Sequence, residues 1–293
     1  MIKRGIIHKS QKELYFVLVD NKSYKSKARG IFRDKNIKPL VGDQVEITIL
    51  NEDEAIIDRV LERTSQLIRP AVANVDQILL VLTLKSPNLN YTLVDKYLIM
   101  LEHYGLDLIM VFNKIDLLEP HHIQSLMREY MMTSYKIFFT SALEAKGIDN
   151  LKKELKGKIS ALAGPSGVGK SSLINSLTEN QQELETGIIS RKTGRGKHTT
   201  RHTELFEIFD NSFILDTPGF SSLDLSFIED ENQIRYFYPE FMKIQANCKF
   251  QNCQHMNEPY CAVKDALENG LISKRRYENY LLIREEIKKN RRY

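Results

Sequence analysis

Residues 164–171, with the sequence GPSGVGKS, follow an apolar run and precede a stretch with helical spacing. A glycine, four residues and then Gly-Lys-Ser is the pattern of a phosphate-binding loop. Glycines allow the backbone N–H groups of such a loop to turn inward around phosphate oxygens, and the following helix adds a favourable dipole. The loop needs a buried strand before it, here 159–163, and a helix after it, here 172–177. This segment therefore predicts an α/β fold with a mostly parallel sheet.

Two side chains of this loop have specific chemical tasks. Lys170 places a cation beside the β- and γ-phosphates and is a catalytic candidate, and the Ser171 hydroxyl is a predicted Mg²⁺ ligand. The other members of the predicted nucleotide site in this loop are Gly164, Pro165, Ser166, Gly167, Val168, Gly169 and Ser172. The loop therefore predicts a nucleotide bound together with Mg²⁺.

Residues 113–116, NKID, directly follow the strand-like run 108–112 and resemble the guanine-specificity motif of GTPases. A carboxylate at Asp116 can accept hydrogen bonds from guanine N1–H and from the exocyclic amine. Adenine offers no donor there and would leave the carboxylate unpaired. The alternative interpretation is a charged turn after a strand. The presence of a phosphate-binding loop in the same chain favours guanine recognition. The predicted contacts of this motif are Asn113, Lys114 and Asp116.

Two further segments resemble GTPase motifs. Residues 140–142, TSA, resemble a short GTPase motif of low specificity that packs behind the guanine ring. Residues 216–219, DTPG, follow the apolar run 213–215 and resemble the DxxG motif, in which the acid holds Mg²⁺ through water and the glycine N–H meets the γ-phosphate. The residues that these segments would contribute are Ser141, Ala142, Asp216 and Gly219.

The motifs occur in an unusual order. Conventional GTPases begin with the phosphate-binding loop and end with NKxD and SA, whereas here NKID and TSA come first and DTPG comes last. A parallel sheet buries the same strands whichever surface connection is cut, so such a permutation is physically tolerable. The order predicts a circularly permuted GTPase domain.

Residues 192–201, KTGRGKHTTR, lie where switch I is expected, although a flexible basic loop is the alternative. Thr199 or Thr200 is the candidate for contact with Mg²⁺ and the γ-phosphate, and we favour Thr200. Phe220 stands where many GTPases carry the glutamine that orients the attacking water, and a phenyl ring cannot do this. His198 is the best replacement because an imidazole can accept a hydrogen bond from water near neutral pH, although it could instead contact RNA phosphate.

The two ends of the chain have other patterns. Short strand-like runs in the first 66 residues fit a small barrel, of which an OB-fold is the one that we favour. These runs are 13–20, 25–33, 44–50 and 55–61. Apolar strands and amphipathic helices alternate from residue 75, including a helix expected over 93–104, and this pattern stops near residue 227. We therefore predict a barrel over 1–66, the GTPase domain over 67–229 and a small helical module over 230–293.

The three cysteines of the chain lie close together in that last module, in the pattern Cys-x4-Cys-x-His-x5-Cys. Three thiolates and one imidazole suit a closed, tetrahedral, structural Zn²⁺ site, one per chain. An iron–sulfur cluster fits less well with a histidine as fourth ligand, and three unrelated buried thiols are the remaining alternative. The predicted zinc ligands are Cys248, Cys253, His255 and Cys261.

The net charge of +4 is unevenly distributed. Residues 274–293 contain eight Lys or Arg and three Glu, and residues 187–203 contain five Lys or Arg and no acid. Such runs are either solvated faces or surfaces for a polyanion such as RNA. The chain shows no signal-peptide pattern and no apolar run of membrane-spanning length, so we expect a cytoplasmic protein without a membrane partner, and we expect it to be a monomer.

Together these residues resemble the ribosome small-subunit-dependent GTPase family. The resemblance spans essentially the whole chain, from ARG at 28–30 and PLVGD at 39–43 through NKID, GPSGVGKSS, GRGKHTTRH and DTPGF to the Cys/His cluster. It implies an OB-fold, a permuted GTPase and a zinc module. It also implies a GTPase that binds the small ribosomal subunit and its ribosomal RNA late in assembly, cycles between GTP and GDP, and is stimulated by the subunit.

Two other functions fit the same motifs. A GTP-gated RNA-binding module with negligible turnover would keep every nucleotide motif but lack a working His198, and a multiple-turnover assay distinguishes it from an enzyme. A GTPase that acts on tRNA or on the large subunit would share the basic surfaces, and sedimentation with separated subunits distinguishes it.

Overall fold

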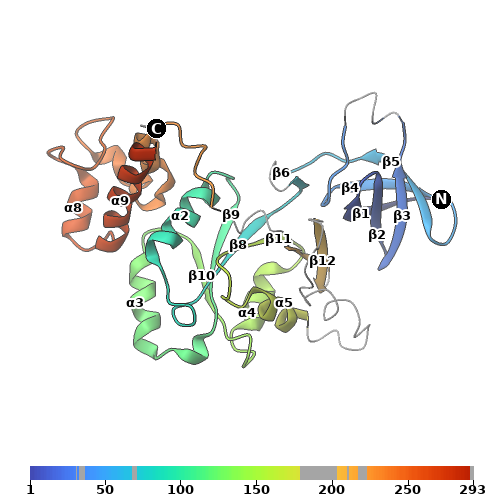
Figure 1. Cartoon of the computed structure of the whole chain (residues 1–293), viewed down its shortest axis with the longest axis horizontal. Helices are drawn as coiled ribbons and strands as arrows, with labels where there is room; N and C mark the ends of the chain where they lie inside the picture. The colour runs from blue at the N-terminus through green and yellow to red at the C-terminus, as the bar shows by residue number, and fades with distance from the viewer. Residues whose placement is uncertain are drawn as a thin grey trace.

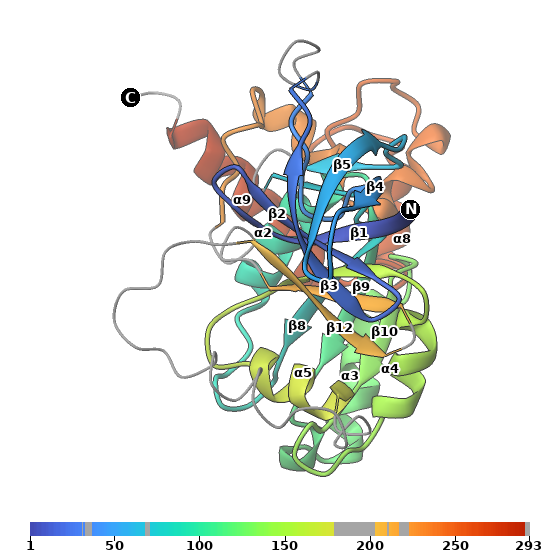
Figure 2. The same ribbon diagram turned by 90° about the vertical axis from the view of Figure 1, so that its right-hand side faces the viewer.

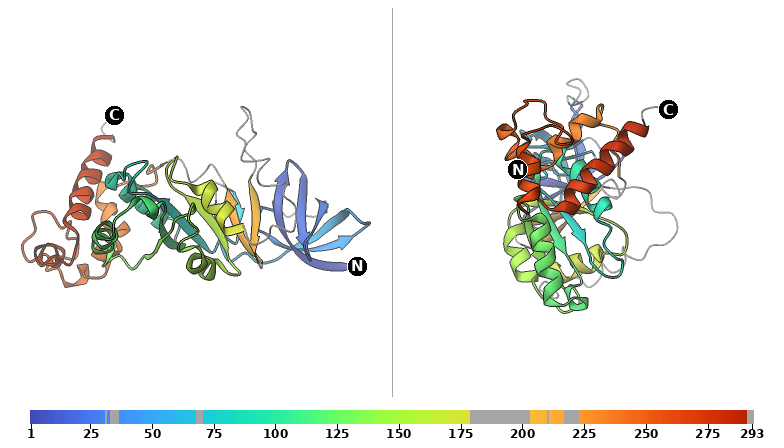
Figure 3. Two further views of the ribbon diagram at one scale, coloured as in Figure 1. Left: turned by 90° about the horizontal axis from the view of Figure 1, so that it is seen from below. Right: turned by 90° about the vertical axis from the view of Figure 1, so that its left-hand side faces the viewer.

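The computed structural model describes residues 1–30, 32, 37–67, 71–178, 203–209, 211–216 and 223–290. Three units follow one another along the longest axis of the molecule (Figure 1). A barrel that contains the amino terminus lies at one end, an α/β unit lies in the middle, and a helical module that contains the carboxy terminus lies at the other end. Figure 3 shows the same row from below. No described helix has the length and apolar character needed to cross a bilayer.

The barrel contains five strands and is closed. Its strands are β1 (Ile2–Gln11), β2 (Leu14–Val19), β3 (Lys22–Ala28), β4 (Gln44–Ile49) and β5 (Glu54–Val60). They pair in the order β1-β2-β3-β5-β4, and β4 pairs again with β1, which leaves no open edge. This OB-like barrel confirms the expected fold. β1 was not anticipated, because Gly5 and several cations interrupt its apolar alternation.

The middle unit is a twisted, mostly parallel sheet. Its strands are β8 (Gln77–Leu82), β9 (Asp107–Phe112), β10 (Lys136–Phe139), β11 (Ile159–Ala163), β12 (Glu204–Phe209) and β13 (Ser212–Asp216). The order is β10-β9-β8-β11-β13-β12, and only β12 is antiparallel to its neighbour. β8 and β11 are buried along their whole length, as continuous apolar runs in a covered parallel sheet should be.

Helices cover both faces of this sheet. α2 (Tyr91–Glu102) and α3 (Pro120–Tyr130) pack with one set of alternate strand residues, including Leu80 and Met110. α4 (Ile148–Leu155) and α5 (Lys170–Thr178) pack with the other set, including Leu79 and Val111. Successive side chains of a strand point to opposite faces, so this division follows from the period of two. The arrangement confirms the predicted α/β class.

The barrel and the α/β sheet are joined edge to edge through β1 and β12. Lys9 is paired with Glu204 in this antiparallel contact, and their side chains form an ion pair of 3.3 Å. Figure 2 shows the barrel in front of the α/β unit. A short separate sheet, β6 (Gln66–Leu67) with β7 (Val72–Ala73), lies in the connection between the two units.

The carboxy-terminal module consists of short helices and one longer helix, α9, packed around their own core. Its elements are η4 (Glu231–Phe237), α7 (Pro239–Met242), η5 (Gln245–Asn247), α8 (Ala262–Glu268) and α9 (Lys274–Asn290). Tyr238, Phe241 and Tyr280 are fully buried there. The Ser273 hydroxyl accepts the N–H of Arg276 at 3.3 Å, which caps the amino-terminal end of α9.

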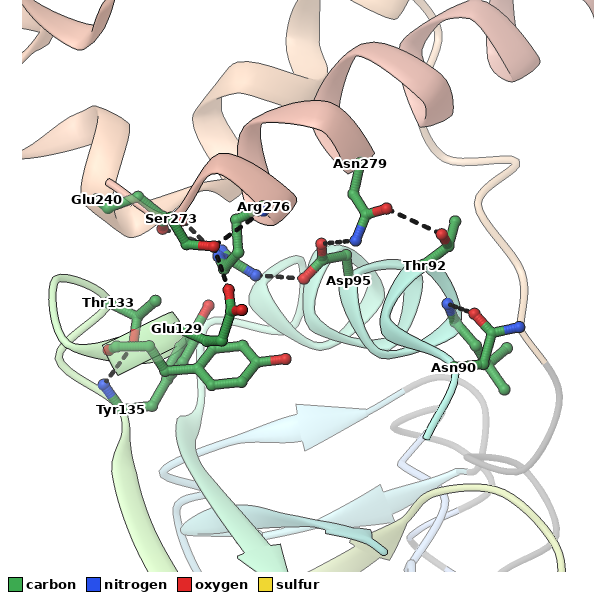
Figure 4. Close-up of polar contacts among 12 residues, drawn as sticks. Asn90, Thr92, Asp95, Glu129, Thr133, Tyr135, Glu240, Ser273, Arg276 and Asn279 are labelled. Carbon is green, nitrogen blue, oxygen red and sulfur yellow. Dashed lines mark hydrogen bonds and ion pairs between the residues drawn. The ribbon is translucent and has the colours of Figure 1, made fainter. Parts of the chain in front are cut away.

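This module is joined to α2 by buried charged groups (Figure 4). The guanidinium of Arg276 in α9 donates to both carboxylate oxygens of Glu240 in α7 and to the carboxylate of Asp95 in α2. Asn279 donates to the other oxygen of Asp95 at 2.7 Å and accepts from the Thr92 hydroxyl at 2.9 Å. Because these charges are buried and mutually paired, the module has a defined orientation on the GTPase unit.

Candidate nucleotide site and metal centre

The predicted nucleotide motifs lie at the carboxyl edge of the parallel sheet. NKID follows β9, TSA follows β10 and the phosphate-binding loop follows β11. β9 and β11 are the two neighbours of β8, and β10 is the next strand beyond β9. Loops that follow neighbouring parallel strands converge at one edge, which is where open α/β sheets bind ligands.

The phosphate-binding loop is shaped by glycines with positive φ. Gly164 has φ +126°, and a Cβ there would lie 2.2 Å from the carbonyl oxygen of Val81. Gly169 has φ +89°, and its Cβ would lie 2.5 Å from Nδ2 of Asn113. Both positions therefore exclude any side chain. Lys170 extends back over the loop and donates to the carbonyls of Gly164 and Pro165 at 2.8 and 2.7 Å.

Asn113 connects the three loops. Its side-chain amide is buried, and Nδ2 donates to the carbonyl of Val168 in the phosphate-binding loop at 3.1 Å. Oδ1 accepts from the N–H of Ala142 at 3.1 Å and from the hydroxyl of Thr140 at 3.2 Å. One buried amide thus fixes the separation between the phosphate-binding loop and the TSA segment. Its hydrogen bonds are costly to break because water cannot replace them in the buried site.

Lys114 has the left-handed conformation, with φ +61°. Its ammonium donates to the carbonyl of Gly167 at 2.8 Å and to the carbonyl of Ser86. Ser86, which lies in the connection between β8 and α2, belongs to none of the predicted motifs. Its place a few residues after the buried strand β8 is a usable signal, because the loops that follow parallel strands lie at the ligand-binding edge.

Asp116 and Ser141 contact one another. The Ser141 hydroxyl donates to Oδ1 of Asp116 at 2.5 Å and also accepts the N–H of Glu144 at 3.1 Å. The hydrogen bond holds one oxygen of the carboxylate in place. The other oxygen belongs to the same rigid group, so the acceptor that guanine would meet is preoriented.

Some predicted residues fall beyond the part of the chain that the structure describes. The switch I candidates His198, Thr199 and Thr200 lie there, and so does Gly219. The backbone of Asp216 ends β13 beside β11, which brings the end of this strand to the edge that carries the phosphate-binding loop. The roles of these residues stay predictions.

The three cysteines and His255 form one compact cluster. Their ligand atoms all lie within 4.8 Å of one another, and the three cysteines form no disulfide. His255 Nδ1 lies 3.4 Å from Cys261 Sγ and 3.8 Å from Cys248 Sγ, and the two sulfurs are 4.0 Å apart. With metal–ligand distances of about 2.0–2.3 Å, a tetrahedral Zn²⁺ site requires ligand separations of about 3.5–3.8 Å, so the cluster fits such an ion.

Groups around the cluster fix its backbone. Arg235 donates to the carbonyl of Cys253 at 2.9 Å, and the Tyr277 hydroxyl donates to the carbonyl of His255 at 2.6 Å. Burial lowers the pKa of His255 to about 4, so the imidazole is neutral at pH 7 and offers a lone pair to a metal. The three thiols and the imidazole, held together by these contacts, form a set of donors suited to a metal ion.

The phosphate-binding loop, the amide that ties it to NKID, and the order of the strands define a P-loop GTPase with permuted motifs. The family model described as the RsgA GTPase matches residues 60–226, and the model of the RsgA N-terminal domain matches residues 4–57. The chain belongs to the RsgA GTPase family, and its enzymatic activity is GTP hydrolysis. The family predicted from the motifs is confirmed.

Relatives cover nearly the whole chain. A protein named small ribosomal subunit biogenesis GTPase RsgA from Agathobacter rectalis is 47% identical over 272 residues, which are 92% of this chain and 89% of that protein. The protein of the same name from Alkaliphilus metalliredigens is 42% identical over 294 residues and the full length of both chains. The crystal structure of YjeQ from Thermotoga maritima has a TM-score of 0.80 at 37% identity and covers 98% of each chain. The structure of YloQ, a circularly permuted GTPase, has a TM-score of 0.80 at 32% identity and covers 99% of this chain and 96% of that one.

Proposed function

We propose that this GTPase binds guanine nucleotide between its phosphate-binding loop and the loops after β9 and β10, and that it acts in biogenesis of the small ribosomal subunit. The observation that carries the nucleotide assignment is the position of Asn113. Its amide bonds the phosphate-binding loop on one side and the TSA segment on the other. A ligand that spans these loops has phosphates at one end and a base at the other.

The described residues have separate tasks at this site. Asp116, held by Ser141, would accept the two donors of guanine. Lys170 would exchange its carbonyl acceptors for oxygens of the β- and γ-phosphates, and the Ser171 hydroxyl would bind Mg²⁺. Mg²⁺ supplies positive charge to the phosphates during hydrolysis. Every protein group named here binds or orients, which suits a reaction that depends on positioning and electrostatics.

The predicted switch residues complete the proposal. Thr200 and Asp216 would hold Mg²⁺, directly and through water, and the Gly219 N–H would meet the γ-phosphate. Phe220 cannot orient water, so we assign that task to His198, which lies in the predicted switch I.

The Cys/His cluster would hold one structural Zn²⁺. The core of the carboxy-terminal module is small, and a bound zinc contributes on the order of 10 kcal/mol of apparent folding free energy in small domains. The ligands would be Cys248, Cys253, His255 and Cys261, whose ligand atoms already lie within 4.8 Å of one another.

The small ribosomal subunit and its ribosomal RNA are the proposed partner. The relatives carry the name small ribosomal subunit biogenesis GTPase and align over almost the full chain. The acid-free run 187–203 and the basic end 274–293 provide charge for RNA phosphates. Ordering of switch I around a γ-phosphate would bring its cations together, so we expect the GTP form to bind better than the GDP form. Such a protein would act in the cytoplasm.

Co-sedimentation tests this proposal. The protein is mixed with purified small or large subunits in a non-hydrolysable GTP analogue or in GDP, over a salt series, and GTP turnover is measured in parallel. We expect retention by the small subunit in the analogue, a steep decline with salt, and faster turnover with that subunit. Equal retention in both nucleotides, preference for the large subunit, or unstimulated turnover would contradict it.

A further inference from the structure

An exposed aromatic pair lies beside the Cys/His cluster with a lysine between its members. The Tyr260 side chain is 73% exposed and that of Phe250 is 45% exposed. The ammonium of Lys249 lies 4.7 Å from the ring centroid of Tyr260 and 5.9 Å from that of Phe250. We call Lys249, Phe250 and Tyr260 the knuckle surface. Large rings held in water are unfavourable unless something covers them.

The knuckle surface is part of the cluster's own backbone. Lys249 and Phe250 directly follow the ligand Cys248, and Tyr260 directly precedes the ligand Cys261. The N–H of Lys249 donates to the carbonyl of Tyr260 at 3.1 Å, and the N–H of Cys253 donates to the carbonyl of Phe250 at 3.2 Å. The two segments that present the rings are therefore bonded together, which lowers the entropy cost of binding a ligand to them.

The backbone of Tyr260 is in an unfavourable conformation. Its φ is +56°, a region in which a residue with a Cβ is uncommon and costs on the order of 1 kcal/mol or more. This backbone conformation places the tyrosine ring on the solvent side of the cluster, where no burial of the ring offsets the energetic cost of the conformation. Strained residues that persist in this way gather at functional sites.

The charge next to the rings indicates an anionic partner. Among the described residues, no carboxylate lies within ion-pairing distance of Lys249, whose recorded side-chain contacts are the two rings. Residues 243–264, the segment that contains both rings, include three Lys and one Glu. A flat apolar face beside a cation complements the π-face of a base and the phosphate attached to it.

We propose that the knuckle surface binds an unpaired base of RNA, which stacks on Tyr260 and Phe250 while Lys249 contacts the adjacent phosphate. This inference rests on the proposed function only in taking ribosomal RNA as the partner. Stacked bases in duplex RNA keep their faces covered, so the surface selects single-stranded segments.

Fluorescence of a single introduced tryptophan tests the proposal. The chain contains no tryptophan, so Tyr260→Trp places the only one at the knuckle surface. Titration of the full chain with a single-stranded octanucleotide RNA should quench this fluorescence, and the same RNA in a duplex should quench it much less. Phe250→Ala or Lys249→Ala in the Tyr260→Trp background should each weaken the binding roughly five- to hundredfold. Met127→Trp on α3, a position also exposed, is the matched control and should not be quenched.

The outcomes separate this inference from the proposed function. Equal quenching by single strand and duplex, or no effect of Phe250→Ala and Lys249→Ala, overturns it. Quenching by intact small subunits but by no RNA oligonucleotide indicates a ribosomal protein as the contact and also overturns it. If Tyr260→Trp still sediments with small subunits without quenching, the inference fails while the proposed function stands.

Discussion

Replacement of Arg276 by alanine tests how the carboxy-terminal module is held on the GTPase unit. Arg276 is buried between Asp95 of α2 and Glu240 of α7, which are also buried (Figure 4). Without the guanidinium, the carboxylates of Asp95 and Glu240 stay buried with no cation to pair with. Removal of one partner of a buried ion pair costs about 3–5 kcal/mol, far more than the pair contributes relative to apolar residues.

Hydrogen exchange measures this loss of stability locally, at the backbone amides of α9. Protection factors of the slowest amides in α9 should decrease by about two to four orders of magnitude in Arg276→Ala, since each 1.4 kcal/mol is a factor of ten. Lys274→Ala is the matched control in the same helical turn. Its side chain is 84% exposed and its ion pair with Glu278 spans 3.8 Å, so the loss should stay below about 0.5 kcal/mol.

The loss of stability in Arg276→Ala should also depend on pH. Burial raises the pKa of Asp95 to about 6, against the attraction of Arg276, which lowers it. A carboxyl whose folded pKa exceeds its unfolded value destabilises the fold as pH rises from about 4 to about 6, because the folded state releases the proton at a cost. Without Arg276 the pKa rises further, so the defect should be larger at pH 8 than at pH 5. Equal protection in Arg276→Ala and Lys274→Ala, or a defect that does not change with pH, would refute this account.

Four other substitutions test the proposed chemistry. Asp116→Asn should weaken GTP binding by on the order of 3 kcal/mol, about a hundredfold in Kd, and favour xanthosine nucleotide, whose 2-oxo group accepts from the amide; a wild type that binds ATP as well as GTP sinks the idea. Cys253→Ser should remove the one zinc found by elemental analysis and loosen only residues beyond about 227, whereas loss of GTP binding would argue against a separate module. Lys170→Ala should abolish tight nucleotide binding, but His198→Ala should keep binding near normal and lower only the stimulated kcat; an unchanged stimulated rate would exclude His198 as the water-orienting group.

The sequence determined the class, the motif order and the family, because these depend on short local patterns. A phosphate-binding loop requires a strand before it and a helix after it, and both are found, as β11 and α5. The four cluster residues lie within fourteen positions, so their convergence follows from proximity along the chain. The predicted limits at 66 and 229 and the roles of the switch residues stay predictions.

Only the tertiary structure decided how the three units are joined. In the sequence, Asp95 is one polar residue of an amphipathic helix, and Arg276 is one of several cations in a basic run. Their contact joins positions 181 residues apart. The Lys9–Glu204 pair between barrel and sheet spans 195 residues, and the carbonyl of Ser86 that Lys114 bonds belongs to another loop. Periodicity and local motifs carry no information on such partners, because long-range pairing depends on which surfaces the fold brings together.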